Sequence, residues 1–234
     1  MRTLILTIAL FSGLICNAQE MHFTVYNFTV EAKNVSTVYK LFDDYFSKNK
    51  PADVTVSLWE NHFNDSGNNF SHSVVFSGNL ESMGAMYSRG NNDTWSLFIS
   101  RVNQHMKEGF SSAMGRNLAT YGNTSEEHPY QRYYLLDVDE MSKWTDSFKI
   151  MAENNNTEGQ ILMMGNLTVG HGPEGVNAWV ISGFKDFKTA MAGAGSLRTD
   201  AENEAASKAW DKHREEGGEV ELVRSGMRIL LKSW

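Results

Sequence analysis

The stretch that decides the fold is residues 54–78, VTVSLWENHFNDSGNNFSHSVVFSG, because a similar stretch, GQILMMGNLTVGHGPEGVNAWVISG, returns at residues 159–183. Each copy has two runs of strand-forming residues on either side of a segment rich in Gly and Asn. This is the pattern of a β-hairpin with a loop longer than two residues. The second copy begins 105 positions after the first and matches it without gaps. We therefore predict an internal duplication with two similar halves.

The residues around each hairpin repeat the same order of strands and helices. A strand is predicted at residues 22–31 and again at residues 131–139, where apolar and polar side chains alternate. Each is followed by a helix with one apolar side, formed by Val35, Val38, Phe42 and Tyr45 in the first half and by Met141, Trp144, Phe148 and Met151 in the second. A further helix and strand follow each hairpin, so each half has the ferredoxin-like order β-α-β-β-α-β.

Length and charge limit the classes of protein to which the chain can belong. Its 234 residues are enough for two units of about 100 residues, so we predict a first repeat at 19–124 and a second at 125–234. The net charge of -7 argues against the basic surface that a nucleic-acid partner requires. We expect no nucleic acid to bind.

The first 18 residues have the composition of a secretory signal peptide, with Arg2, a short apolar run and the small-residue site Cys16-Asn17-Ala18. The apolar run is shorter than the roughly 20 residues that cross a bilayer, so no stable membrane anchor is predicted. Lipid attachment at Cys16 is a weaker alternative, because the preceding Ile15 is not small. We expect a secreted or periplasmic protein, cleaved after about Ala18, whose mature chain has no cysteine and hence no disulfide.

A four-stranded antiparallel sheet with helices on one face must bury its other face, and the second copy supplies the partner. This arrangement resembles the dimeric α+β barrel superfamily, in which two ferredoxin-like units pack sheet to sheet. Here both units would lie in one chain, as an intramolecular α+β barrel. The superfamily includes antibiotic-biosynthesis-type monooxygenases, haem-degrading monooxygenases and stress-responsive barrel proteins. The resemblance implies a monomer with an internal pseudo-two-fold axis, and further oligomerisation is left open.

A candidate binding site follows from the predicted strand pairing. If each hairpin turn is centred in its loop, Asn61 pairs with His72 and Asn166 pairs with Asn177. The sheet face that carries the aromatic and amide side chains then looks into the space between the two sheets. The predicted ligand-binding residues on this face are Trp59, Asn61, His72, Asn166, Asn177 and Trp179. They would bind a small apolar or aromatic molecule. The alternative is a filled core with a few hydrogen-bonded amides near its rim.

A catalytic alternative comes from the resemblance alone. Haem-degrading monooxygenases place an Asn on the first strand and a Trp and a His on the second helix, and Asn27, Trp95 and His105 match these types in order. The histidines are otherwise scattered, and His62 with His72 lacks a third ligand, so no metal site is predicted. Two functions therefore remain open. One is a small-molecule-binding or interaction module without a cofactor, and the other is a cofactor-poor or haem-degrading monooxygenase-like enzyme.

Overall fold

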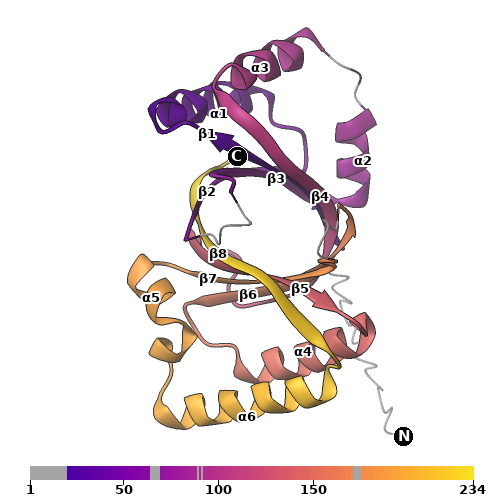
Figure 1. Ribbon diagram of the computed structural model, residues 1–234, viewed down its shortest axis with the longest axis vertical. Helices are drawn as coiled ribbons and strands as arrows, with labels where there is room; N and C mark the ends of the chain where they lie inside the picture. Colours follow the sequence, from indigo (N-terminus) through magenta and orange to yellow (C-terminus); the bar gives the residue numbers. More distant parts are fainter. Residues whose placement is uncertain (1–19, 64–68, 89, 91, 171–174) are drawn as a thin grey trace, which may run out of the picture.

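A closed ring of eight strands runs through the middle of the molecule, and helices cover it on two opposite sides (Figure 1). The computed structural model describes residues 20–63, 69–88, 90, 92–170 and 175–234. The predicted signal peptide and the predicted centres of both hairpin turns lie outside these residues. None of the described helices is both long and apolar enough to cross a membrane.

Both halves have the predicted order of elements, so the predicted α+β class and the ferredoxin-like order are confirmed. The first half consists of β1 (Met21–Val30), α1 (Val35–Asn49), β2 (Val54–His62), β3 (His72–Asn79), α2 (Leu80–Ser88), α3 (Asp93–Asn103) and β4 (Met106–Tyr121). The second consists of β5 (Tyr130–Val138), α4 (Met141–Asn155), β6 (Gln160–Val169), β7 (Ala178–Phe184), α5 (Phe187–Ala192), α6 (Asp200–Glu216) and β8 (Val220–Ser233). Each half has one extra short helix, α2 or α5, directly after its hairpin.

The strand order around the ring is β1-β3-β2-β8-β5-β7-β6-β4, and all neighbouring strands are antiparallel. Two of these pairings join the halves, because β2 binds β8 and β4 binds β6. The two sheets therefore face each other as predicted and are also hydrogen-bonded along both edges. We call the ring's interior the inner face and the helix-covered side the outer face.

The outer face of the first half is closed by an aromatic core. The Phe98 ring on α3 lies 4.3 Å from Tyr45 and 5.2 Å from Phe42, both on α1. The C-terminal end of β8 reaches the same core, where the Trp234 ring lies 5.6 Å from Phe46. These large rings fill the layer between the helices and the sheet, which leaves little room for a ligand there.

The strand register differs from the prediction by one residue in both hairpins. Glu60, and not Asn61, is opposite His72, and Asn166 is opposite Ala178. Because side chains alternate between faces, a slip of one residue moves each side chain on the slipped strand to the other face of the sheet. The placement of His72 and Asn166 on the inner face was therefore wrong. Long loops do not fix the register, and burial of the apolar residues of β2 and β3 under the helices does.

Candidate functional site

The inner face carries two of the predicted ligand residues on β2, and both are engaged by protein groups. The Arg228 guanidinium lies 4.2 Å above the Trp59 ring, and its Nε and Nη2 donate to Gln131 Oε1 at 3.0 and 2.8 Å. Burial lowers the pKa of Arg228 to about 10. Trp59 is only 6% exposed, so this contact between β2 and β8 is part of the packed interior.

A chain of hydrogen bonds crosses the inner face from β2 to β4. Asn61 Nδ2 donates to Ser73 Oγ (2.9 Å), and Ser73 Oγ donates to Asn27 Oδ1 (2.8 Å). Asn27 Nδ2 then donates to Ser111 Oγ (2.9 Å). The two amides are thus linked through the Ser73 hydroxyl and bind protein groups, as expected for partly buried polar side chains.

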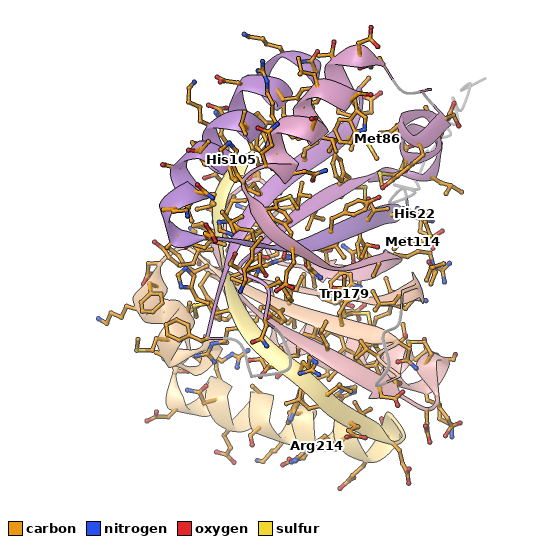
Figure 2. The ribbon with its side chains drawn as sticks, turned by 45° about the horizontal axis from the view of Figure 1, so that its top comes forward. His22, Met86, His105, Met114, Trp179 and Arg214 are labelled. Atoms are coloured by element: carbon orange, nitrogen blue, oxygen red, sulfur yellow. The ribbon has the colours of Figure 1, made fainter. Side chains whose placement is uncertain are left out.

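Trp179 lies between the two halves (Figure 2), on the inner face of β7. Its ring makes an edge contact with Phe23 at 5.5 Å and packs with Tyr133 and Ile181, which are at most 9% exposed. Gly165 on the neighbouring strand makes room for the indole, because a Cβ there would lie 2.3 Å from Trp179 Cζ2. The space between the sheets is thus occupied by side chains, which supports the filled-core alternative.

Three predicted ligand residues are not directed into the interior. The His72 ring is on the outer face, stacked 5.9 Å from Phe28, with Nδ1 hydrogen-bonded to Ser71 Oγ at 2.8 Å. Asn166 shares the outer face with Ala178. The Asn177 amide binds the backbone N and O of Val138 at 3.0 and 2.9 Å, and so extends the pairing next to β5.

The three residues of the haem-degrading pattern are not brought together. Asn27 faces inward, whereas Trp95 packs against Tyr45 and Phe98 on the outer face. His105 lies in the turn between α3 and β4, as Figure 2 shows, and its carbonyl oxygen accepts from Asn34 Nδ2. The sheet separates Asn27 from the other two, so these residues do not form one site.

A cavity of about 790 Å³ lies on the outer face of the second half, between the sheet and helices α4 and α6. Its walls are mainly apolar and include Leu136, Trp144, Phe148, Leu162, Val180 and Trp210. This volume is in the range of small-molecule sites, about 300–1,000 Å³. No residue here belongs to the site predicted from the sequence.

The cavity exists because α6 has smaller side chains toward the sheet than its counterpart α3. The buried core residues of α3 are Phe98 and Val102. On α6 the cavity is lined by Asn203, Ala206 and Ser207, followed by Trp210, His213 and Arg214 nearer its C-terminal end. α6 buries only His213, near its C-terminal end. The duplicated units thus differ in how the layer under the second helix is filled.

Polar groups gather where α4 ends and β6 and α6 begin. Gln160 Nε2 donates to Ser182 Oγ at 2.7 Å, and Gln160 Oε1 has no hydrogen-bond partner among the described residues. Gln160 is only 5% exposed. Arg198 Nη2 donates to the carbonyl oxygen of Asn155 at 2.7 Å, and burial lowers the pKa of Arg198. An unpaired acceptor and a partly desolvated cation therefore lie on the cavity wall.

A buried imidazole lies near the C-terminal end of α6. Ser147 Oγ donates to the carbonyl oxygen of Trp144 at 3.2 Å and lies 2.7 Å from His213 Nδ1. Because the hydroxyl proton is directed to the carbonyl, we assign the shared proton of the second bond to Nδ1, which leaves the lone pair on Nε2. Burial lowers the pKa of His213, so its ring is neutral at pH 7.

Comparison with known proteins supports the fold. No family model and no curated sequence matches the chain significantly. Similar solved structures include a proposed monooxygenase from Lactobacillus acidophilus NCFM, with 12% identity, a TM-score of 0.58 and coverage of 92% of this chain and 96% of the other. A second proposed monooxygenase, from Fusobacterium nucleatum, has 12% identity, a TM-score of 0.59 and coverage of 92% and 94%. An anthrone oxidase-like protein has 11% identity, a TM-score of 0.57 and coverage of 93% and 94%.

The chain has the dimeric α+β barrel fold. Both units of this α+β barrel lie in one polypeptide. The similarity covers nearly the whole length of this chain and of each similar structure. At an identity near 12%, the structural similarity shows the fold alone. The chemistry has to be inferred from the residues of the site. Among the described residues of the barrel, no group of three metal-ligating side chains comes together.

Proposed function

We propose that the chain binds a small, largely apolar molecule in the cavity between α6 and the sheet of the second half. The supporting observation is an apolar cavity of about 790 Å³ whose wall contains the unpaired Gln160 Oε1. A buried acceptor without a partner costs about 1–3 kcal/mol, and a donor group of a ligand would remove that cost. On the inner face, Trp59 and Trp179 are packed against protein groups.

Binding of N-phenyl-1-naphthylamine, an uncharged fluorescent probe, tests this proposal. We expect saturable binding that is lost in Ala206→Phe, because Ala206 lines the cavity and the ring would fill it. Ala205→Phe is the matched control, since Ala205 is exposed on the same helix and does not line the cavity. Equal binding by the two variants would contradict the proposed site.

A monooxygenase-like enzyme is the second candidate, favoured by the similarity to two proposed monooxygenases and an anthrone oxidase-like protein. In that case the cavity would hold an aromatic substrate during its reaction with oxygen. Oxygen uptake in the presence of an anthrone is the direct measurement. Turnover should be lost in Ala206→Phe and retained in Ala205→Phe, whereas probe binding without oxygen uptake favours a binding module.

A haem is a further ligand that we propose for this cavity. His213 lines the cavity and has an unprotonated Nε2 that would bind the iron. A bound haem would supply oxygen activation. His213 would hold the iron, and the rings of Trp144 and Phe148 would exclude water. Absorption spectroscopy during haem titration should show binding that weakens strongly in His213→Gln, and unchanged binding would remove His213 as the ligand.

For localisation we propose export, supported by the signal-peptide pattern of residues 1–18. Mass spectrometry of the exported protein should find an N-terminus near Gln19. Retention of residues 1–18 in the exported product would contradict a cleaved signal peptide. We further propose that the protein is a monomer with two related halves. Light scattering of the purified chain measures its molecular mass in solution and so tests this proposal.

A further inference from the structure

We infer that the ligand of this cavity is an organic anion: an apolar body with a carboxylate-type or sulfonate-type group next to a hydroxyl or N–H. The anionic group binds Arg198, and the neighbouring donor binds Gln160. This inference rests on the proposed binding function and specifies the class of molecule that the site takes.

The positive charge of Arg198 is not ion-paired with a carboxylate in the part of the chain that the structure describes. Arg116 and Arg214 are ion-paired with Glu20 and Asp211. Within the described ranges Arg198 has no such partner, and its hydrogen bond goes to a main-chain carbonyl. A partly buried cation is stabilised when an anion enters beside it. Arg198 therefore has an unfilled preference for a negatively charged ligand group.

Glu202, the acid whose charge acts on Arg198, is hydrogen-bonded to the N-cap residue of α6. Its Oε2 accepts from Thr199 N at 2.7 Å and from Thr199 Oγ1 at 2.8 Å. The bond from Thr199 N and the bond from Glu202 N to Thr199 Oγ1 together form the capping box of the helix. Glu202 affects Arg198 through space without an ion pair. Because its carboxylate is already hydrogen-bonded to the cap, it leaves the guanidinium open on the cavity side.

The neighbouring pair Gln160 and Ser182 defines the rest of the head group. Ser182 Oγ accepts from Gln160 Nε2, so its own proton is available to donate to an anionic oxygen. Gln160 Oε1 accepts from nothing described and requires a donor. A group that combines an anionic oxygen with an adjacent O–H or N–H satisfies all three side chains. An anion alone leaves Gln160 Oε1 unpaired.

The net charge of the chain disfavours the binding of anions at sites away from Arg198. At -7 the molecule repels anions on average. Selective anion binding in this protein therefore requires a local cation. Arg198 is near Gln160, because it binds the Asn155 carbonyl oxygen and the preceding Leu197 lies beside Gly159. The charge of the whole molecule makes non-specific anion binding a weak competitor in the experiment below.

Two fluorescent probes of the same shape separate the contributions of charge and apolar area. 8-Anilino-1-naphthalenesulfonate has an N–H beside a sulfonate, and N-phenyl-1-naphthylamine has the same rings and N–H without the sulfonate. We expect the sulfonate probe to bind about tenfold more tightly. Arg198→Gln should remove this difference by weakening the sulfonate probe alone. Gln160→Glu, which places a negative charge at the head group, should do the same.

The matched control is Lys208→Gln, which removes one positive charge from a side chain on α6 that is 74% exposed. It should leave both affinities unchanged. Equal binding of the two probes, or equal effects of Arg198→Gln and Lys208→Gln, overturns the anion inference while the binding function stands. Failure of both probes to bind, or binding that survives Ala206→Phe, overturns the proposed function itself.

Discussion

His72 and His213 lie in corresponding layers of the two halves, each buried on the outer face against aromatic rings. His72 stacks on Phe28, and His213 lies 5.5 Å from Phe148 and 5.3 Å from Trp210. Burial lowers the pKa of both imidazoles. Glu60 opposes this effect at His72, and His62 adds to it. A charged ring is disfavoured in either place, so protonation favours the unfolded chain.

The free energy of unfolding should therefore fall as the pH drops below about 6.5, the pKa of an unfolded histidine. The stabilising contribution is fully present above that pH, and it is lost progressively until the lower pKa of the folded state is reached. Urea unfolding at pH 8.5, 7.5, 6.5 and 5.5 measures this slope. His72→Gln and His213→Gln should each make the slope between pH 7.5 and 5.5 shallower. Slopes identical to that of the parent chain would contradict the assignment.

At the scale of single residues, the sequence predicted the residue types of the barrel interior better than it predicted the sheet face on which each side chain lies. Trp59, Asn61 and Trp179 were correctly assigned to the inner face. His72 and Asn166 were misplaced because a slip of one residue exchanges the faces, and a loop of uncertain length does not determine it. The role of Asn177 was not predictable, because its amide binds the backbone of a strand far away in the sequence.

Two glycines show how the elements depend on local space. A Cβ on Gly165 of β6 would lie 2.1 Å from the Arg116 carbonyl oxygen and 2.3 Å from Trp179 Cζ2. A Cβ on Gly84 of α2 meets nothing within 4 Å. The same substitution must therefore have opposite effects at the two sites.

Gly165→Ala should lower the free energy of unfolding by about 1–3 kcal/mol or more, because backbone and a packed ring must both move. Gly84→Ala should raise it by roughly 0.5–1 kcal/mol through helix propensity. Denaturant unfolding of both variants beside the parent chain gives the comparison. A neutral Gly165→Ala would mean that the Trp179 ring is not held against β6.

The cavity under α6 was not predicted, because it arises where large side chains are missing from core positions and not where functional residues cluster. The helix from residue 200 onward has charged residues around a single large apolar one, Trp210, which is also the composition of a solvent-exposed helix. A comparison of α6 with α3 indicates the cavity. Phe98 and Val102 of α3 have no equally large counterparts among Asn203, Ala206 and Ser207 of α6. In a duplicated chain, a large-to-small difference at a core position predicts a pocket.

The molecule as a whole is joined by contacts across two seams. At the β2–β8 seam Arg228 stacks on Trp59, and Ser57 Oγ lies 3.1 Å from Ser233 Oγ. Lys232 Nζ and Trp234 Nε1 both donate to Asp43 Oδ1, at 2.6 and 3.1 Å. The order of elements was predicted from the sequence, and it required the bare sheet faces of the two units to pack together. The edge pairing that closes the ring was not predictable, because hydrogen bonds between strand edges leave no periodic pattern in the residues.

Residues 20–124 expressed alone should form a dimer or aggregate. The isolated half has two unpaired edge strands, β2 and β4, and an uncovered inner face that carries Phe23 and Trp59. Size-exclusion chromatography with light scattering measures the mass, with the full-length chain as the reference. A soluble monomer with native-like amide resonances would show that the first half is stable without the second.

The seam between β2 and β8 also makes the timing of synthesis matter. When β4 has left the ribosome, about 110 residues remain before β8 is complete, and at about 5–20 residues per second this takes roughly 6–22 s. During that interval the first half has all its helices, and β4 gains its partner β6 part-way through, but the β2 edge has no partner until β8 is made. A nascent chain that waits this long with one open edge can pair with its neighbour on the same messenger. Wide spacing between ribosomes on the messenger should therefore limit this pairing between nascent chains.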